Sequence, residues 1–128
     1  MIILIVLFFC HWLADFTHLS TNRMLKAKRF GTPLFPILAH AAAHAGLMGF
    51  ALFLWRVYYS LPVMNSVTYA ILLQWLSHFL IDLWKGKMNV WFPSLQDPAN
   101  KFHWYIFGFD QFLHTVVIII MAKMIGAI

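Results

Sequence analysis

Long apolar runs alternate with short polar segments along this chain of 128 residues. Each run approaches the roughly 20 residues that a helix needs to cross the hydrocarbon core of a bilayer. Proline marks the starts of the second and third runs, at Thr32-Pro33 and Leu61-Pro62, because it fits a first helical turn and disfavours helix before it. The pattern predicts an all-α, integral membrane four-helix bundle in one domain, with spans at about residues 2–20, 33–55, 63–84 and 103–125.

Composition supports a membrane location, since 62% of the residues are hydrophobic and 10% are charged, against roughly 25% charged in a soluble domain. By the positive-inside rule, the two basic connections are cytoplasmic and both termini face outward. This orientation, with attraction to anionic lipids, explains the net charge of +5 without a nucleic-acid partner. The basic residues of the two connections are Arg23, Lys26, Lys28, Arg29, Lys85, Lys87 and Lys101.

Each apolar run carries two polar side chains four residues apart. Residues at this spacing share one face of a helix. At a rise of about 1.5 Å per residue, all of them lie about 4–16 Å below the predicted cytoplasmic boundary. The sequence therefore predicts one polar layer in the cytoplasmic half of the membrane. Its pairs are His11 with Asp15, His40 with His44, His78 with Asp82, and Asp110 with His114.

Part of this pattern repeats along the chain. His11 precedes His78 by 67 residues, and His40 and His44 precede Asp110 and His114 by 70 residues each. The first two spans and the last two therefore look like duplicated helical hairpins in the same orientation. Functional sites commonly form where such halves meet.

The buried acids require compensation. An aspartate at the centre of a membrane helix costs about 2.5–3.5 kcal/mol on insertion scales, and three of the chain's four acids lie in the spans. Imidazole and carboxylate are ligands of divalent zinc, iron and manganese, so we predict one or two metal ions, zinc first. Hydrogen bonding between helices alone is the competing interpretation. The candidate ligands are His11, Asp15, His40, His44, His78, Asp82, Asp110 and His114.

Three further polar side chains accompany these pairs. Gln74 and Gln111 could orient the ligands, or they could bridge helices. Lys85 lies three residues after Asp82, so it could pair with that carboxylate or meet an anionic group. Snorkelling to the interface is the alternative for this lysine.

The motifs His-X-X-X-Asp in the first span, His78-X-X-X-Asp82-X-X-Lys85 in the third and Asp110-Gln111-X-X-His114 in the fourth resemble domain-of-unknown-function family 3307. Its members are small bacterial and phage membrane proteins, and the resemblance covers nearly the whole chain. It implies a location in the bacterial inner membrane and no established activity. The signature positions it implies are His11, Asp15, His40, His78, Asp82, Lys85, Asp110, Gln111 and His114.

Two other features have weaker links to the layer. His18 lies seven residues after His11 on the same helix face, but it is nearer the interface, and the resemblance would place a glutamine there. It therefore ranks below the other candidate ligands. The alanines and glycine at residues 39–46 surround the second pair. They could leave room for a substrate or allow tight helix packing.

We predict a metal-dependent hydrolase of a lipid or amphiphilic phosphoester, in a membrane whose lipids are its partners. The metal would activate water, Asp15, Asp82 or Asp110 would accept the proton, and Lys85 would hold the substrate's anion. A di-iron oxidase or desaturase and an ion or proton transporter could use the same residues. The outer half of the spans has few ionisable side chains, which favours a site open to one side, although a homo-oligomer could build a path between protomers.

Overall fold

The computed structural model describes residues 1–59 and 64–128, and all their regular secondary structure is helical, which confirms the all-α class. Leu61-Pro62 lies outside the described residues, so its predicted role as a span start stays a prediction. The elements are α1 (Ile2–Phe16), α2 (Asn22–Phe30), α3 (Leu34–Tyr58), α4 (Met64–Trp91), the 3₁₀-helix η1 (Pro93–Gln96) and α5 (Lys101–Met124).

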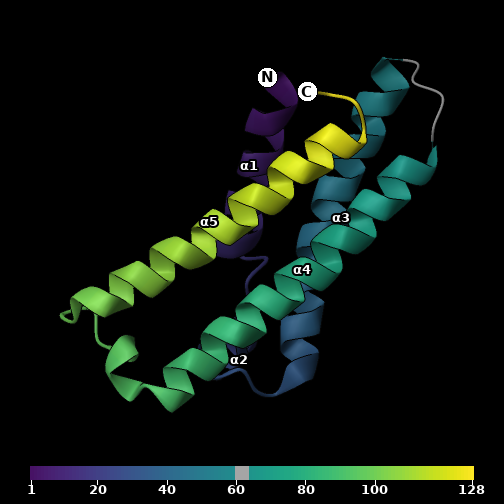
Figure 1. The fold of residues 1–128 in the computed structure, drawn as a ribbon. Coiled ribbons are helices and arrows are strands. Elements are labelled where there is room, and N and C mark those ends of the chain that lie inside the picture. Colours follow the sequence, from purple (N-terminus) through teal and green to yellow (C-terminus); the bar gives the residue numbers. More distant parts are fainter. Residues whose placement is uncertain (60–63) are drawn as a thin grey trace.

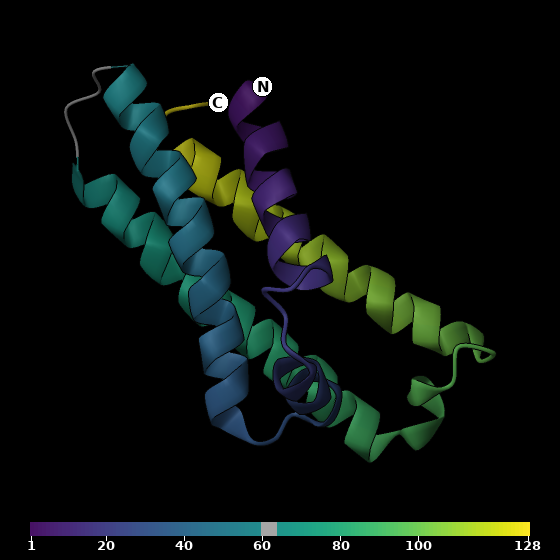
Figure 2. The same ribbon diagram turned by 180° about the vertical axis from the view of Figure 1, so that it is seen from behind.

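The long helices run back and forth between two ends of the molecule (Figure 1). Both termini lie at the end where α3 stops and α4 starts, and the view from behind shows the same arrangement (Figure 2). The short elements α2 and η1 lie at the opposite end. We call these the terminal end and the α2 end.

Three helices of the described chain are long and apolar enough to cross a membrane, namely α3, α4 from Asn65 and α5. The prediction of four spans is therefore confirmed for three. The first predicted span is not confirmed, because α1 has 15 residues and a length of about 22 Å, whereas the hydrocarbon core of a membrane is about 30 Å thick. The Thr17 hydroxyl donates to the Leu13 carbonyl, and Ser20 Oγ donates to the Ala14 carbonyl at 2.9 Å. These side chains take carbonyls that another helical turn would have used.

The polar segment after α1 is a helix, although the sequence was interpreted as a connection there. Thr21 caps α2 by accepting a hydrogen bond from Met24 N at 3.3 Å, and Gly31 ends it with a φ of 65°. The second basic connection, predicted between residues 84 and 103, is shorter than expected. Helix α4 continues to Trp91 and therefore includes Lys85. Helix α2 packs against the last turns of α4, where Asn89 Nδ2 donates to the Arg29 carbonyl.

A glycine contact fixes α2 on α4. A Cβ at Gly86 would lie 2.3 Å from Gly31 N and 2.6 Å from the Lys28 carbonyl oxygen. Only a residue without a side chain allows the backbone of α2 to come this close. Gly86 therefore sets the position from which Lys28 extends.

An apolar core fills the terminal end of the molecule. Small residues also bring α3 close to α4, since Ala41 and Ala45 are buried and a Cβ at Gly49 would lie 2.5 Å from the Ile71 side chain. Buried members of the core are Ile3, Leu7, Cys10, Met48, Leu52, Val67, Ala70, Val117, Ile118, Met121, Ala122 and Ile125.

We expect Gly86→Ala to destabilise the protein by about 1–3 kcal/mol, because the added methyl group forces α2 off α4. Gly46→Ala is the matched control, since a Cβ at Gly46 meets nothing within 4 Å and alanine favours helix by up to about 1 kcal/mol. Thermal unfolding in detergent measures both. A Gly86→Ala protein as stable as Gly46→Ala would contradict the close packing of α2.

Candidate metal centre

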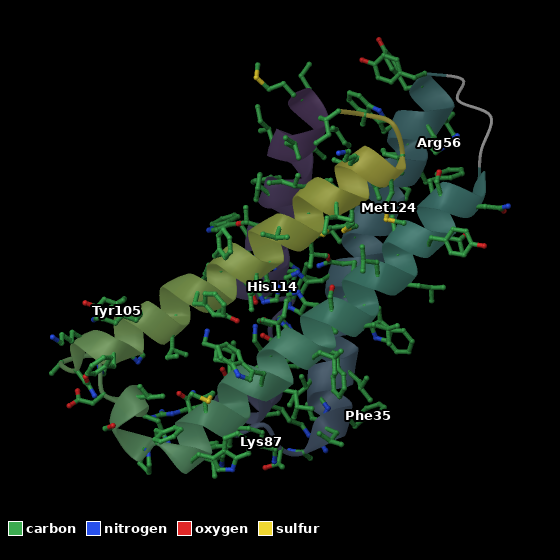
Figure 3. All side chains as sticks on the ribbon, in the orientation of Figure 1. Phe35, Arg56, Lys87, Tyr105, His114 and Met124 are labelled. Atoms are coloured by element: carbon green, nitrogen blue, oxygen red, sulfur yellow. The ribbon has the colours of Figure 1, made fainter. Side chains whose placement is uncertain are left out.

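The structure brings all eight candidate ligands together in the interior, and none is more than 8% exposed. We call these eight residues the His/Asp layer. They come from α1, α3, α4 and α5, on the side of the apolar core that faces the α2 end. In Figure 3, His114 lies mid-molecule, with Met124 and Arg56 toward the terminal end and Phe35, Lys87 and Tyr105 toward the α2 end.

Histidine rings from all four helices meet in this layer. The ring centroids of His44 and His78 are 3.7 Å apart, and those of His78 and His114 are 4.2 Å apart. The His11 centroid lies 4.9 Å from that of His44 and 5.0 Å from that of His114. The layer is thus a single cluster of imidazoles and not four separate pairs.

The four-residue spacing has the expected local result. In three pairs the histidine Nε2 approaches its own carboxylate, at 3.3 Å for His11 and Asp15, 3.4 Å for His78 and Asp82, and 3.5 Å for His114 and Asp110. In the fourth pair, the ring centroids of His40 and His44 are 4.7 Å apart.

Two subsets of the layer have the geometry of a metal site. Each residue of a subset offers one ligand atom, and these atoms lie within 4.8 Å of one another. His78 belongs to both subsets, whereas His11 and Asp110 belong to neither. The layer therefore could hold a metal ion. The first subset is Asp15, His40, His44 and His78, and the second is His78, Asp82 and His114.

Several buried polar atoms of the layer make no hydrogen bond to any described residue. They include both ring nitrogens of His11 and of His44, and Nε2 of His78. Asp110 Oδ1 approaches an imidazole, and Asp82 Oδ2 approaches an imidazole and the Lys28 ammonium, but both oxygens lack hydrogen-bond geometry. Each such atom costs about 1–3 kcal/mol when it has no partner. Their concentration in one place indicates a partner that these residues do not supply themselves.

Lys28 reaches the layer from α2, whereas the sequence pattern predicts this lysine only as part of a basic connection. Its Nζ lies 2.7 Å from Asp15 Oδ1, 3.3 Å from Asp82 Oδ2 and 2.9 Å from His40 Nε2. Burial lowers the pKa of this ammonium, but Asp82 and Asp15 outweigh burial and hold the pKa above its ordinary value. Lys28 is therefore a cation at neutral pH and compensates two of the buried carboxylates.

The sequence did contain a signal for this lysine. Threonine is a good N-cap and glycine a good helix end, so Thr21 and Gly31 frame a short helix with Lys28 in its last turn. Ser20 was also missed. Its Oγ lies 3.1 Å from His40 Nδ1, within hydrogen-bond distance.

Lys85 pairs with a carboxylate, but with Asp110 on α5 and not with Asp82. Its Nζ lies 2.6 Å from Asp110 Oδ2, and Gln111 Nε2 donates to the same oxygen at 3.1 Å. Gln74 Nε2 lies 3.4 Å from His78 Nδ1. Both glutamines thus contact residues of the layer. His18 is exposed and lies outside it.

A cavity of about 580 Å³ lies beside the layer, toward the α2 end. Asp15 and Asp110 form part of its wall, together with Lys28 and Lys85. Among the described residues, none from α3 lines it. The alanines and glycine at 39–46 therefore do not make room in this cavity, and of these residues Ala41 and Ala45 are buried in the helix packing.

Comparison with known proteins identifies a family but no activity. The model of a family described as a protein of unknown function (DUF3307) matches residues 3–128. Searches of curated proteins and of solved structures find no match. The family match confirms the resemblance that the motifs indicated, and the function has to be inferred from the site.

We expect His78→Ala to lose most of the metal that the wild-type protein retains after zinc loading, because this residue is common to both subsets. His18→Ala removes an exposed imidazole and should retain the wild-type amount. Elemental analysis of the purified proteins gives the metal content per chain. Equal losses in the two variants would show that the metal is not bound in the layer.

The same measurement distinguishes the two subsets. If the second subset binds the ion, His114→Ala should lose metal while His40→Ala retains it. The first subset predicts the reverse.

Proposed function

The chain belongs to the DUF3307 family of proteins of unknown function, and from its site we propose that it is a membrane-embedded, metal-dependent hydrolase of a lipid or amphiphilic phosphoester. The observation that carries the proposal is the set of buried imidazole and carboxylate atoms without a hydrogen bond to a described residue, in a layer whose Asp15 and Asp110 line a cavity that is also lined by cations. Imidazole and carboxylate without thiolate suit zinc, with iron or manganese as alternatives. Three helices are long and apolar enough to cross a membrane, which supports a lipid or amphiphile as the substrate.

We assign one metal ion to the second subset, His78, Asp82 and His114. The first subset is less available, because Lys28 Nζ lies 2.7 Å from Asp15 Oδ1 and 2.9 Å from His40 Nε2 there. In the second subset the same ammonium approaches only Asp82 Oδ2, at the longer distance of 3.3 Å. The glutamine contact at His78 Nδ1 leaves Nε2 of that ring for a metal, and one nitrogen atom serves one ion. Three protein ligands also leave a coordination position open, as in catalytic zinc sites.

Asp110 is the proposed general base. An ion in the layer would supply a Lewis acid for water and for the phosphoryl oxygen. Asp110 lines the cavity and belongs to neither subset, and its Oδ2 is held by Lys85 and Gln111. Its Oδ1, which makes no hydrogen bond to a described residue, can accept a proton. As water oxygen bonds to phosphorus, the ester P–O bond breaks, and Asp110 passes the water proton to the departing alcohol.

A transporter is the competing proposal, because the imidazole contacts run across four helices. Such a protein needs polar groups on both sides of the layer. Toward the terminal end the buried cluster is hydrophobic, and the buried cation there, Arg56, donates to Ser66 Oγ at 3.1 Å. One such group is not a polar path, and this supports a site open only toward the α2 end. A di-iron oxidase would need two ions. The two subsets share His78, whose free Nε2 can bind only one of them, so two ions are disfavoured.

We also propose that the cavity faces the cytoplasm. Lys26 and Lys87 belong to the α2 end, on α2 and the last turns of α4, together with Arg23. Basic residues concentrate on the cytoplasmic side of membrane proteins.

We expect Asp110→Asn to retain bound metal and to lower the rate of phosphodiester hydrolysis at least about 100-fold, the usual contribution of a general base. Asp97→Asn is the matched control, because Asp97 is the remaining acid of the chain and is exposed. Both can be assayed with bis(4-nitrophenyl) phosphate and with phosphatidylglycerol vesicles, after loading with zinc, manganese or ferrous iron.

Two results would overturn the proposal. Wild-type protein that binds metal but hydrolyses neither ester would exclude a hydrolase of this substrate class, and metal-dependent ion flux in proteoliposomes would then favour the transporter. Full activity in Asp110→Asn would exclude Asp110 as the base.

A further inference from the structure

Arg29 is the one arginine or lysine of the cavity wall without a carboxylate partner among the described residues. The three cations that line the cavity are Lys28, Arg29 and Lys85. Lys28 is held by Asp15 at 2.7 Å and Lys85 by Asp110 at 2.6 Å. The guanidinium of Arg29 is therefore the cation left for an anion from outside the protein.

A closed ring of hydrogen bonds holds Arg29 at the cavity wall. Arg29 Nε donates to Gln96 Oε1 at 3.2 Å, Gln96 Nε2 donates to the Asn89 carbonyl at 2.9 Å, and Asn89 Nδ2 donates to the Arg29 carbonyl at 3.2 Å. All three residues line the cavity, and they join α2, α4 and η1. The ring uses only Nε of the guanidinium. Within the described chain, the two terminal nitrogens make no hydrogen bond and could bind an oxyanion through both N–H groups.

The same cavity has an apolar side. Phe16, Leu25 and Phe107 line it, and Phe16 and Leu25 are 59% and 45% exposed. Side chains of this kind suit a hydrocarbon chain better than a fully hydrated ion. The wall thus combines an anion site, an apolar surface and two carboxylates of the His/Asp layer.

We propose that this cavity binds the phosphodiester headgroup of a singly charged lipid and that Arg29 holds its phosphate. The inference rests on the proposed function, because it names the substrate of the same site. One unpaired guanidinium matches one negative charge, and its planar fork matches two phosphate oxygens. A zwitterionic lipid brings its own cation to the site, and inorganic phosphate lacks the chains that the apolar side would contact. Arg29 thereby takes the anion-holding role that the sequence suggested for Lys85.

The test compares Arg29→Gln with Arg23→Gln, which removes the same charge from the same helix at a position outside the cavity wall. Native mass spectrometry in detergent measures binding of phosphatidylglycerol, phosphatidylcholine and inorganic phosphate. We expect wild-type protein to prefer phosphatidylglycerol and Arg29→Gln to bind it about 10- to 100-fold more weakly, as the loss of a charge-assisted hydrogen bond predicts. Arg23→Gln should bind as wild type does, and Arg29→Lys should fall between.

Metal content reports whether each variant retains the layer. Arg29→Gln with normal metal content and unchanged lipid binding would overturn the inference, as would equal weakening by Arg23→Gln. Equal binding of phosphatidylcholine, or equally tight binding of inorganic phosphate, would also overturn it. Lipid binding that depends on Arg29 without any hydrolysis would leave this inference standing and refute only the hydrolase. Hydrolysis with a KM unaffected by Arg29→Gln would support the hydrolase and refute the role of Arg29.

Discussion

The burial of three carboxylates in an apolar helical protein is the constraint on which the rest of this structure depends. Each would cost about 2.5–3.5 kcal/mol in a membrane helix without a partner. Lys28 compensates Asp15 and Asp82, and Lys85 compensates Asp110. Lys28 lies on the short helix α2, and the close contact at Gly86 holds this helix against α4. Local packing and buried charge are therefore coupled.

Compensation by lysine does not complete the site. The imidazoles of His11 and His44 lie among these carboxylates with no hydrogen bond to a described residue, and a metal ion is the partner that such a mixture of ligands favours. The layer also divides the molecule, with an apolar core toward the terminal end and a cationic cavity toward the α2 end. This one-sided arrangement suits chemistry on a molecule that enters from one side.

Much of the site follows from sequence because its ligands lie at helical spacing within apolar runs. His78 and Asp82 share a face by helix geometry alone, and the direction of each run placed all four pairs at similar depth. Lys28 was missed because a nine-residue polar helix has the hydropathy of a connection. The pairing of Lys85 with Asp110 depends on how α5 packs against α4, which spacing within one helix does not determine. The length of α1 likewise depends on the hydrogen bonds of Thr17 and Ser20.

Whether a metal ion completes the His/Asp layer is tested most directly by X-ray absorption spectroscopy of the purified wild-type protein after zinc loading and removal of free metal. One open site predicts about one zinc ion per chain with histidine nitrogen and carboxylate oxygen in its coordination shell. Absence of retained zinc, and of iron or manganese after the same treatment, would contradict this conclusion. Lys28, Lys85 and hydrogen bonds between helices would then be the whole compensation for the buried carboxylates.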